Sequence, residues 1–139
     1  MAADGLLESV SRLALFHDLD AADLERLLSI VDERSYNEGT WVVRRGDVDI
    51  GLYFIVAGEV GVLLEDEELA VLSTGSFFGE ISVLLGELAV ADIIARTPLR
   101  CLYIPPDSAQ DFLIQNPRVM FRMLQTEARR LRATDELHS

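Results

Sequence analysis

Apolar residues in the first third of the chain recur at helical spacing. The pattern predicts two helices, the first over residues 6–15 and the second opened by Asp20 as its N-cap. In the second helix one face carries Leu24, Leu27, Leu28 and Val31. That spacing indicates a stripe that packs on a core, with charged residues on the opposite side.

From Thr40 the pattern changes to short, β-rich apolar runs separated by turn residues. The predicted strands cover residues 41–43, 52–56, 60–64, 69–72, 90–95 and 99–104. Glycines at Gly46, Gly58 and Gly75 fall between runs, where hairpins need a positive φ angle. Strands this short and this regularly spaced favour an antiparallel barrel or sandwich.

Helical periodicity returns after the pair of prolines that follows the last strand. We expect a helix over residues 109–114 capped by Asp107 or Ser108, a break at Asn116 and Pro117, and a last helix over residues 118–133. The predicted fold class is therefore α+β, an antiparallel β-barrel or jelly roll flanked by N- and C-terminal helices. The predicted organisation is one domain over residues 1–139, with helices in 5–34, the barrel in 40–104 and C-terminal helices in 107–133.

Charge is distributed unevenly along a chain whose net charge is −12. Residues 46–95 contain ten acidic and no basic residues, whereas residues 96–139 contain seven arginines and five acids. An acidic surface repels phosphate backbones and anionic lipid heads, so we expect neither nucleic acid nor a membrane as a partner.

The sequence offers no recognisable catalytic or metal-binding constellation. Cys101 has no second cysteine to pair with, and it falls in a predicted strand, where it is expected to be a small buried residue. His17 is interpreted as a solvated loop residue, because no nucleophile or metal-ligand spacing accompanies it. We therefore expect a non-enzymatic cytoplasmic protein without a metal or an obligatory cofactor.

The order of these landmarks resembles the cyclic-nucleotide-binding domain. The resemblance rests on the glycine turns, the apolar strand over residues 52–55, the turn at Gly58 and Glu59, and the segment Gly75-Ser76-Phe77-Phe78-Gly79-Glu80. It covers residues 12–133. The family includes regulatory subunits of cAMP-dependent kinase, catabolite-activator transcription factors and cyclic-nucleotide-gated channels.

The resemblance implies that a phosphate-binding cassette begins at Phe78. In the family a short helix offers backbone N–H groups to the cyclic phosphate, a glutamate accepts from the ribose 2′-hydroxyl, and an arginine nine or ten residues later pairs with the phosphate. Glu80 matches the glutamate, but the arginine position falls on Ala89 or Val90. If binding is retained, the expected ligand-binding residues are Phe78, Gly79, Glu80, Ile81, Ser82, Ala89, Val90 and Ala91.

The missing arginine leaves the predicted site with an electrostatic deficit. No lysine or arginine lies between Arg45 and Arg96, so helix-end N–H groups are the only compensation that can be foreseen for an anion. Arg96 or Arg100 could fold back from the later strands, which strand alternation does not decide. Glu80 itself has two interpretations: it holds a hydroxyl-bearing ligand, or it favours the N-terminal dipole of the short helix and caps the Gly79 turn.

The last predicted helix is the second candidate site. Met120, Leu124 and Leu131 form an apolar seam with a cationic flank that includes Arg129. The seam packs either on the barrel of its own chain or on a protein partner or second copy. We therefore predict a regulatory module with weak or lost cyclic-nucleotide binding that acts through protein contacts. A sensor that binds cAMP, cGMP or another small ligand through Glu80 is the alternative.

Overall fold

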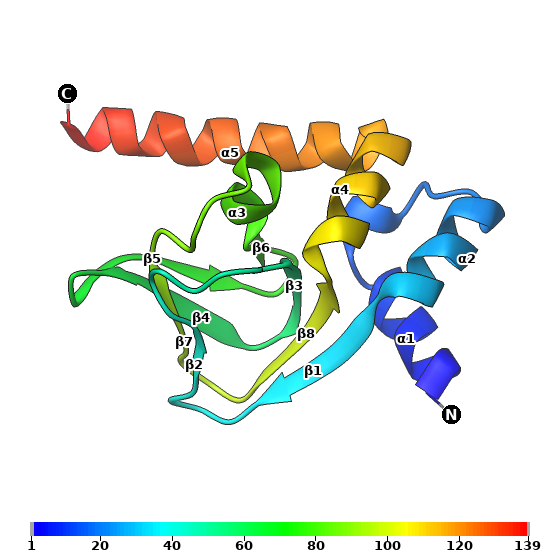
Figure 1. Cartoon of the computed structure of the whole chain (residues 1–139), viewed down its shortest axis with the longest axis horizontal. Coiled ribbons are helices and arrows are strands. Elements are labelled where there is room, and N and C mark those ends of the chain that lie inside the picture. The colour runs from blue at the N-terminus through cyan, green and yellow to red at the C-terminus, as the bar shows by residue number, and fades with distance from the viewer. Residues whose placement is uncertain (1, 139) are drawn as a thin grey trace.

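The chain folds into two four-stranded antiparallel sheets with helices before and after them (Figure 1). The computed structural model describes the backbone of residues 2–138 and the side chains of residues 5–134. The helices are α1 (Ala2–Ser11), the 3-10 turn η1 (Ala14–Phe16), α2 (Ala21–Ile30), α3 (Glu80–Leu85), α4 (Pro106–Gln115) and α5 (Pro117–His138). The strands are β1 (Asp32–Tyr36), β2 (Trp41–Val43), β3 (Leu52–Ala57), β4 (Glu59–Leu64), β5 (Glu67–Ser73), β6 (Phe77–Phe78), β7 (Asp92–Ala95) and β8 (Leu99–Ile104).

The sheets have the strand orders β1-β8-β3-β6 and β2-β7-β4-β5. Strands far apart in the chain are therefore neighbours, as in the pairing of β3 with β8, where Tyr53 lies opposite Tyr103. This is a jelly roll with flanking helices, and it confirms the predicted α+β fold class. Within the described residues, no helix is both long enough and apolar enough to cross a bilayer.

Strand β3 separates two hydrophobic clusters, and this explains its uninterrupted apolar sequence. Leu52, Phe54 and Val56 belong to the cluster that the helices cover. Tyr53 and Ile55, on the opposite face, belong to the cluster between the two sheets. Because successive strand residues point to opposite faces, a strand buried on both sides has no position for a polar residue.

The helices flank the cluster on the outer side of β3. Asp20 caps α2 as predicted, with its carboxylate accepting from the Asp23 N–H at 2.8 Å. Leu27 of the predicted stripe is fully buried. Helix α5 runs across the top of the molecule above α3, and it buries Val119 and Met123 in the same cluster (Figure 1). The three turn glycines have positive φ angles, as predicted.

Two predicted boundaries in the N-terminal part are wrong. Residues 32–36, partly assigned to the helical region 5–34, form strand β1, which pairs antiparallel with β8. This strand reads Asp-Glu-Arg-Ser-Tyr, so it has no apolar alternation to reveal it, and it lies at the edge of its sheet. The helix predicted over residues 6–15 ends at Ser11, and a separate 3-10 turn follows.

The C-terminal helices also differ from the prediction. Helix α4 begins at Pro106 with Pro105 as its N-cap, instead of being capped by Asp107 or Ser108. Proline fits the first turn because its missing N–H would have no intrahelical partner there. Helix α5 begins at Pro117 and continues to His138, beyond the predicted end at residue 133. The prediction that residues 1–139 form one domain stays a prediction.

Candidate ligand-binding site

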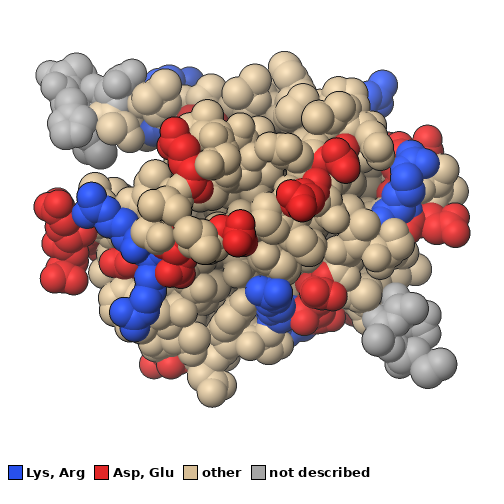
Figure 2. All heavy atoms as spheres, in the orientation of Figure 1, with Lys and Arg blue, Asp and Glu red and all other residues tan. Residues whose placement is uncertain are grey.

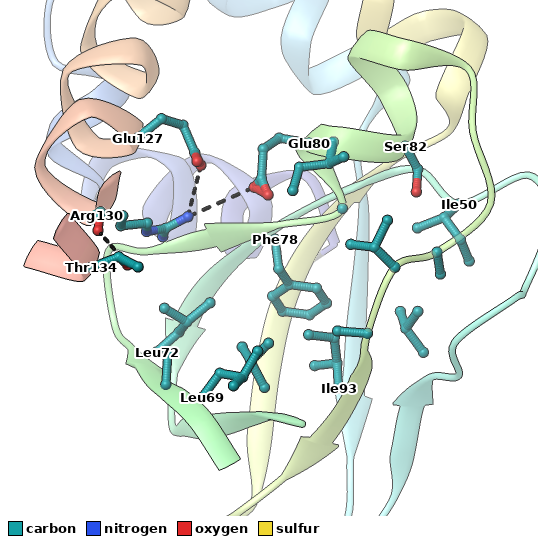
Figure 3. Close-up of a pocket in the computed structure, with 18 residues that line it drawn as sticks. Ile50, Leu69, Leu72, Phe78, Glu80, Ser82, Ile93, Glu127, Arg130 and Thr134 are labelled. Atoms are coloured by element: carbon teal, nitrogen blue, oxygen red, sulfur yellow. Dashed lines mark hydrogen bonds and ion pairs between the residues drawn. The ribbon is translucent and has the colours of Figure 1, made fainter. Parts of the chain in front are cut away.

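A cavity of about 370 Å³ lies between the β2-β7-β4-β5 sheet, the cassette segment and helix α5 (Figure 3). Eighteen residues border it: Val43, Ile50, Val62, Leu69, Ala70, Leu72, Phe78, Gly79, Glu80, Ile81, Ser82, Ala89, Val90, Ala91, Ile93, Glu127, Arg130 and Thr134. All eight residues predicted from the cassette are among them. The fold therefore brings the cassette residues to one cavity, while their binding role stays a prediction.

Gly79 controls how the cassette enters this cavity. Its φ angle is 87°, in the left-handed region, and a Cβ atom there would lie 2.1 Å from the backbone oxygen of Gly51. Only glycine satisfies both conditions without strain. This turn places Glu80 as the first residue of α3, which ends after six residues and is followed by a second left-handed glycine, Gly86.

Ala89 and Val90, at the position of the expected arginine, both border the cavity. The Ala89 backbone is fixed to the loop between β2 and β3, because its oxygen accepts from Gly46 N–H at 2.8 Å and its N–H donates to the Asp47 oxygen at 3.0 Å. Only 7% of Ala89 is exposed. The wall therefore offers a short apolar group where the family pattern has a guanidinium.

Glu80 is buried and incompletely satisfied. Its exposed fraction is 7%, and its Oε2 atom has no hydrogen-bond partner among the described residues. Burial raises the pKa of this carboxyl to about 7; nearby Glu127 raises it further, and Arg130 opposes the rise. The position at the start of α3 agrees with the dipole interpretation. The dipole interpretation does not explain why Glu80 Oε2 is buried without a hydrogen-bond partner among the described residues.

Arg130 of α5 is the functional candidate that the sequence did not reveal. Its guanidinium Nη1 lies 3.8 Å from Glu80 Oε2, within ion-pair range but beyond hydrogen-bond distance. The same group donates to Glu127 Oε1 at 2.8 Å, to Ser76 Oγ at 2.7 Å and to the Phe77 oxygen at 3.3 Å. Its centre lies 4.6 Å from the centre of the Phe77 ring.

The expectation that only helix-end N–H groups bring positive charge to this site is therefore wrong. Arg130 is fifty residues from Glu80 in the sequence, and the packing of α5 over α3 brings them together (Figure 3). The i, i+3 spacing of Glu127 and Arg130 was the available signal. That spacing predicts a pair on the helix surface but does not say which helix face meets the cavity.

The two arginines proposed to fold back do not border the cavity. Arg96 donates from Nε to Glu68 Oε1 at 2.8 Å. Arg100 donates to Glu33 Oε1 at 3.0 Å and to Ser9 Oγ at 3.2 Å. Arg100 lies in β8 between Leu99 and Cys101, which point into the cluster between the sheets, so its side chain points outward. Arg96 directly follows β7, and its guanidinium lies beside Gly61 of β4.

The acidic turn between β4 and β5 is not surrounded by solvent alone, because two of its glutamates lie close to arginines. Glu68 pairs with Arg96, and Glu65 Oε1 lies 3.5 Å from Arg45 Nη1. Figure 2 shows acidic side chains gathered at the left edge, where this hairpin lies in Figure 1, and both signs of charge scattered over the rest of that face. Neighbouring arginines therefore partly balance the anionic middle of the sequence.

Cys101 and His17 lie as the sequence predicts, one buried in a strand and the other exposed in a loop. Cys101 is fully buried between the sheets, and burial raises the pKa of its thiol to about 12, so this thiol is not a reactive one. His17 follows η1 and is exposed.

The predicted interaction seam on α5 is exposed within the described chain. Leu124 and Leu131 expose 62% and 65% of their surface, and Met120 and Arg129 are also exposed. Met123 points the other way, into the core. Helix α5 therefore has two apolar faces, of which one packs on its own chain, and the role of the other stays a prediction.

The fold and the cavity together define a jelly-roll module whose cassette lies between a sheet and a C-terminal helix. The cyclic nucleotide-binding domain family model matches residues 33–116. The chain belongs to the cyclic nucleotide-binding domain family. The match includes β3 to β8 and every cassette residue, whereas Arg130 lies outside it.

Curated relatives resemble this chain over a small part of their length. Cyclic nucleotide-gated channel alpha-4 of Mus musculus is 35% identical over 80 residues, which are 56% of this chain and 14% of the channel. Glutaminase 2 of Bradyrhizobium diazoefficiens is 32% identical over 116 residues, 83% of this chain and 18% of that protein. The chain thus spans less than a fifth of either relative.

Solved structures share the fold at low identity. PKAR CBD2 with bound Sp-2Cl-cAMPS has a TM-score of 0.78 and 16% identity, with 96% of this chain and 92% of that chain covered. The regulatory subunit of a cAMP-independent protein kinase A from Trypanosoma brucei also has a TM-score of 0.78, with 19% identity and coverage of 91% and 46%.

Proposed function

We propose that this chain is a non-catalytic regulatory module in which cyclic-nucleotide binding is weak or lost, and which acts through protein contacts of α5. The observation that carries the proposal is the apolar wall at Ala89 and Val90, where a cyclic phosphate would need a cation. A lost charge-assisted hydrogen bond of about 1.5–3 kcal/mol weakens a complex roughly 10- to 200-fold. A cytoplasmic location and the absence of nucleic-acid and membrane partners stay predictions.

Arg130 does not replace the missing arginine in the observed geometry. Its donors are already directed to Glu127, Ser76 and the Phe77 oxygen. An entering phosphate would have to draw the guanidinium away from these acceptors, and it would also meet the carboxylates of Glu80 and Glu127. Both costs favour weak binding.

Thermal melting with 1 mM cAMP or cGMP tests the weak-binding part. For a Kd near or above 1 mM, a ligand adds at most about 0.4 kcal/mol, so we expect the Tm to rise by less than roughly 2 °C. A micromolar Kd would add about 4 kcal/mol and raise the Tm by more than roughly 8 °C. Such a rise would contradict the proposal.

Sedimentation velocity tests the part that concerns α5. We expect the wild type to self-associate, or to bind a partner protein, through the exposed face that carries Met120, Leu124 and Leu131. Leu124→Asp should abolish self-association, whereas Ile114→Asp, at an equally exposed position on α4, should not. A wild type that stays monomeric at about 100 μM would contradict the homodimer form of the proposal.

A sensor remains the alternative function, and one observation favours it. The buried Oε2 of Glu80 faces a preformed cavity without a hydrogen-bond partner among the described residues. A carboxylate oxygen in that state is a site for a donor on a ligand. In this alternative, ligand binding alters the contacts of Arg130 and thereby the position of α5.

A further inference from the structure

Helix α3 has its polar and apolar positions reversed relative to an ordinary surface helix. Glu80 and Ser82 are buried in it, and both border the cavity described above. Its large aliphatic side chains point to solvent instead. Leu84 and Leu85 of α3, and Leu88 in the loop that follows, each expose more than half of their surface, and none of the three borders that cavity. The cavity therefore accounts for the buried polar residues but not for the exposed leucines.

The exposed leucines lie next to a second hollow, which is acidic. This hollow of about 350 Å³ lies between the β2–β3 loop, the end of α3 and the start of α4, and Gly86 and Leu88 border it. Three carboxylate residues, Asp49, Glu87 and Asp107, also border it. Residues 46–95 and 101–117 contain no lysine or arginine, so no basic residue belongs to the segments that form the hollow. The three leucines and the three carboxylates form one surface, the leucine patch.

The leucine patch has the composition of a docking surface for a basic, apolar segment. Figure 2 shows acidic side chains among uncharged atoms over α3 and α4, whose positions Figure 1 gives. Neighbouring large apolar side chains that are exposed on a folded domain commonly mark a protein interaction site. Carboxylates around such a site favour a partner whose apolar residues are flanked by cations.

The exposed side of α5 has this complementary composition. Phe121, Leu124 and Leu131 each expose at least 60% of their surface. At 3.6 residues per turn, Leu124 and Leu131 lie about 60–80° around the helix from Phe121 on one side. Arg118 and Arg129, both exposed, lie about 60–80° from Phe121 on the other side. These five residues form the arginine face, an apolar stripe with guanidinium groups along one edge.

The arginine face and the leucine patch are both exposed in the single chain, so they do not cover each other there. A foreign partner would have to supply one of the two complementary surfaces, whereas a second copy of this chain supplies both. We propose that the chain self-associates head to tail, with the arginine face of one copy on the leucine patch of the next. This inference rests on the proposed role of α5 in protein contacts, and it names the surface that α5 meets.

A head-to-tail contact joins two different surfaces, so a mixture of two variants tests it by sedimentation velocity. Leu124→Asp disables the arginine face, and Leu85→Asp disables the leucine patch. Both positions are exposed, and circular dichroism checks that each variant is folded. We expect each variant alone to be monomeric at about 100 μM and the equimolar mixture to form a dimer, because each variant retains the surface that the other lacks. A mixture without a dimer overturns the inference.

Two results separate this inference from the proposed function. If the wild type self-associates and Leu124→Asp does not, but Leu85→Asp associates like the wild type, the role of α5 stands and the leucine patch is not its partner. If the wild type is monomeric at about 100 μM, the homodimer form of the proposed function and this inference both fail. Ile114→Asp, at the opposite end of α4 from Asp107, is the control and should associate like the wild type.

Ionic strength tests the charge complementarity of the contact. Salt screens pairs between exposed arginines and carboxylates, so a rise from about 50 to 500 mM NaCl should weaken wild-type association at least about 3-fold. Glu87→Gln removes one of the carboxylates and should reduce this salt dependence, whereas Asp111→Asn, outside the leucine patch, should retain it. Association that salt leaves unchanged or strengthens would overturn the pairing of the arginine face with an acidic surface.

Discussion

An arginine of helix α5 contacts an acidic residue near each end of the helix's described length, and the two contacts differ in their hydrogen bonding. Near its start, Arg122 donates to both carboxylate oxygens of Asp18, at 2.7 Å and 2.6 Å. Near its end, Arg130 lies 3.8 Å from Glu80 Oε2 without a hydrogen bond. The first pair lowers the pKa of Asp18 to about 2, mainly through hydrogen bonds from Arg122, whereas burial raises the pKa of Glu80 to about 7.

An arginine and a carboxylate can therefore form either a fully hydrogen-bonded structural contact or a pair that is left without a hydrogen bond. Asp18 and Arg122 are partly exposed, and two hydrogen bonds join them, one to each carboxylate oxygen. Glu80 is buried beside a cavity, and its nearest cation is shared with Glu127 and Ser76. The incomplete pair, at the cassette, is the one expected to respond to a ligand.

Glu80→Gln should have the largest effect on stability. A carboxyl whose pKa is raised by folding binds its proton more tightly in the native state, so its stabilising contribution is present below pH 4.5 and is lost as pH rises to 7. Glutamine does not ionise. Above pH 7 the variant should therefore be more stable than the wild type by about 2–3 kcal/mol, and the difference should vanish near pH 4.5.

Urea unfolding between pH 4.5 and pH 8 measures this difference directly. Glu87→Gln changes an exposed carboxyl next to the same helix and should leave the pH dependence of the wild type unchanged. A Glu80→Gln variant with the same pH dependence as the wild type would show that Glu80 does not titrate in this window.

Arg130→Met should have an intermediate effect. The methionine keeps apolar packing against Phe77 but removes the hydrogen bonds to Ser76 and the Phe77 oxygen, together with the charge that opposes the pKa rise of Glu80. About a third of the Arg130 side chain is exposed, so solvent screens part of the loss. We expect about 1–2 kcal/mol of destabilisation at pH 8 and less at pH 5.

Arg129→Met is the matched control for this variant, since Arg129 is the exposed neighbour on the same helix turn. It should change the free energy of unfolding by less than about 0.5 kcal/mol. Equal losses of unfolding free energy in the two variants would show that Arg130 at the cavity stabilises the fold no more than an exposed arginine does.

Asp18→Asn should have the smallest effect at neutral pH, because the pair it breaks is solvent-exposed. A carboxyl whose pKa is lowered by folding contributes stability above its ordinary pKa of 3.8, and this is lost as pH falls through 2. We expect a small fall in Tm at pH 7 that disappears near pH 2. Asp111→Asn, on the exposed side of α4, should not change the Tm.

Periodicity predicted most of the fold because most elements expose one face and bury another. The run over residues 52–56 and the glycine turns located the strands, and Asp20 located the start of α2. Strand β1 was missed because its charged residues are held by backbone pairing at a sheet edge, which leaves no hydrophobic pattern.

The candidate site was predictable where it is local in sequence and was missed where it is not. The family resemblance implied the cassette from Phe78 to Ala91, because the residues that carry the resemblance lie close together in the sequence. Arg130 could not, because its place at the cavity depends on the angle at which α5 crosses α3, and that angle is set by packing of residues such as Met123.

An apolar residue, Ala89, stands where phosphate recognition needs a cation, and calorimetric titration of cAMP into wild type and Ala89→Arg tests whether this substitution weakens binding. Ile114→Arg adds the same charge at an exposed position on α4, away from the cavity, and serves as the control. We predict that Ala89→Arg binds cAMP roughly 10- to 200-fold more tightly than the wild type, while Ile114→Arg binds like the wild type. Submicromolar binding of cAMP by the wild type, with no gain in a folded Ala89→Arg variant, would contradict the claim.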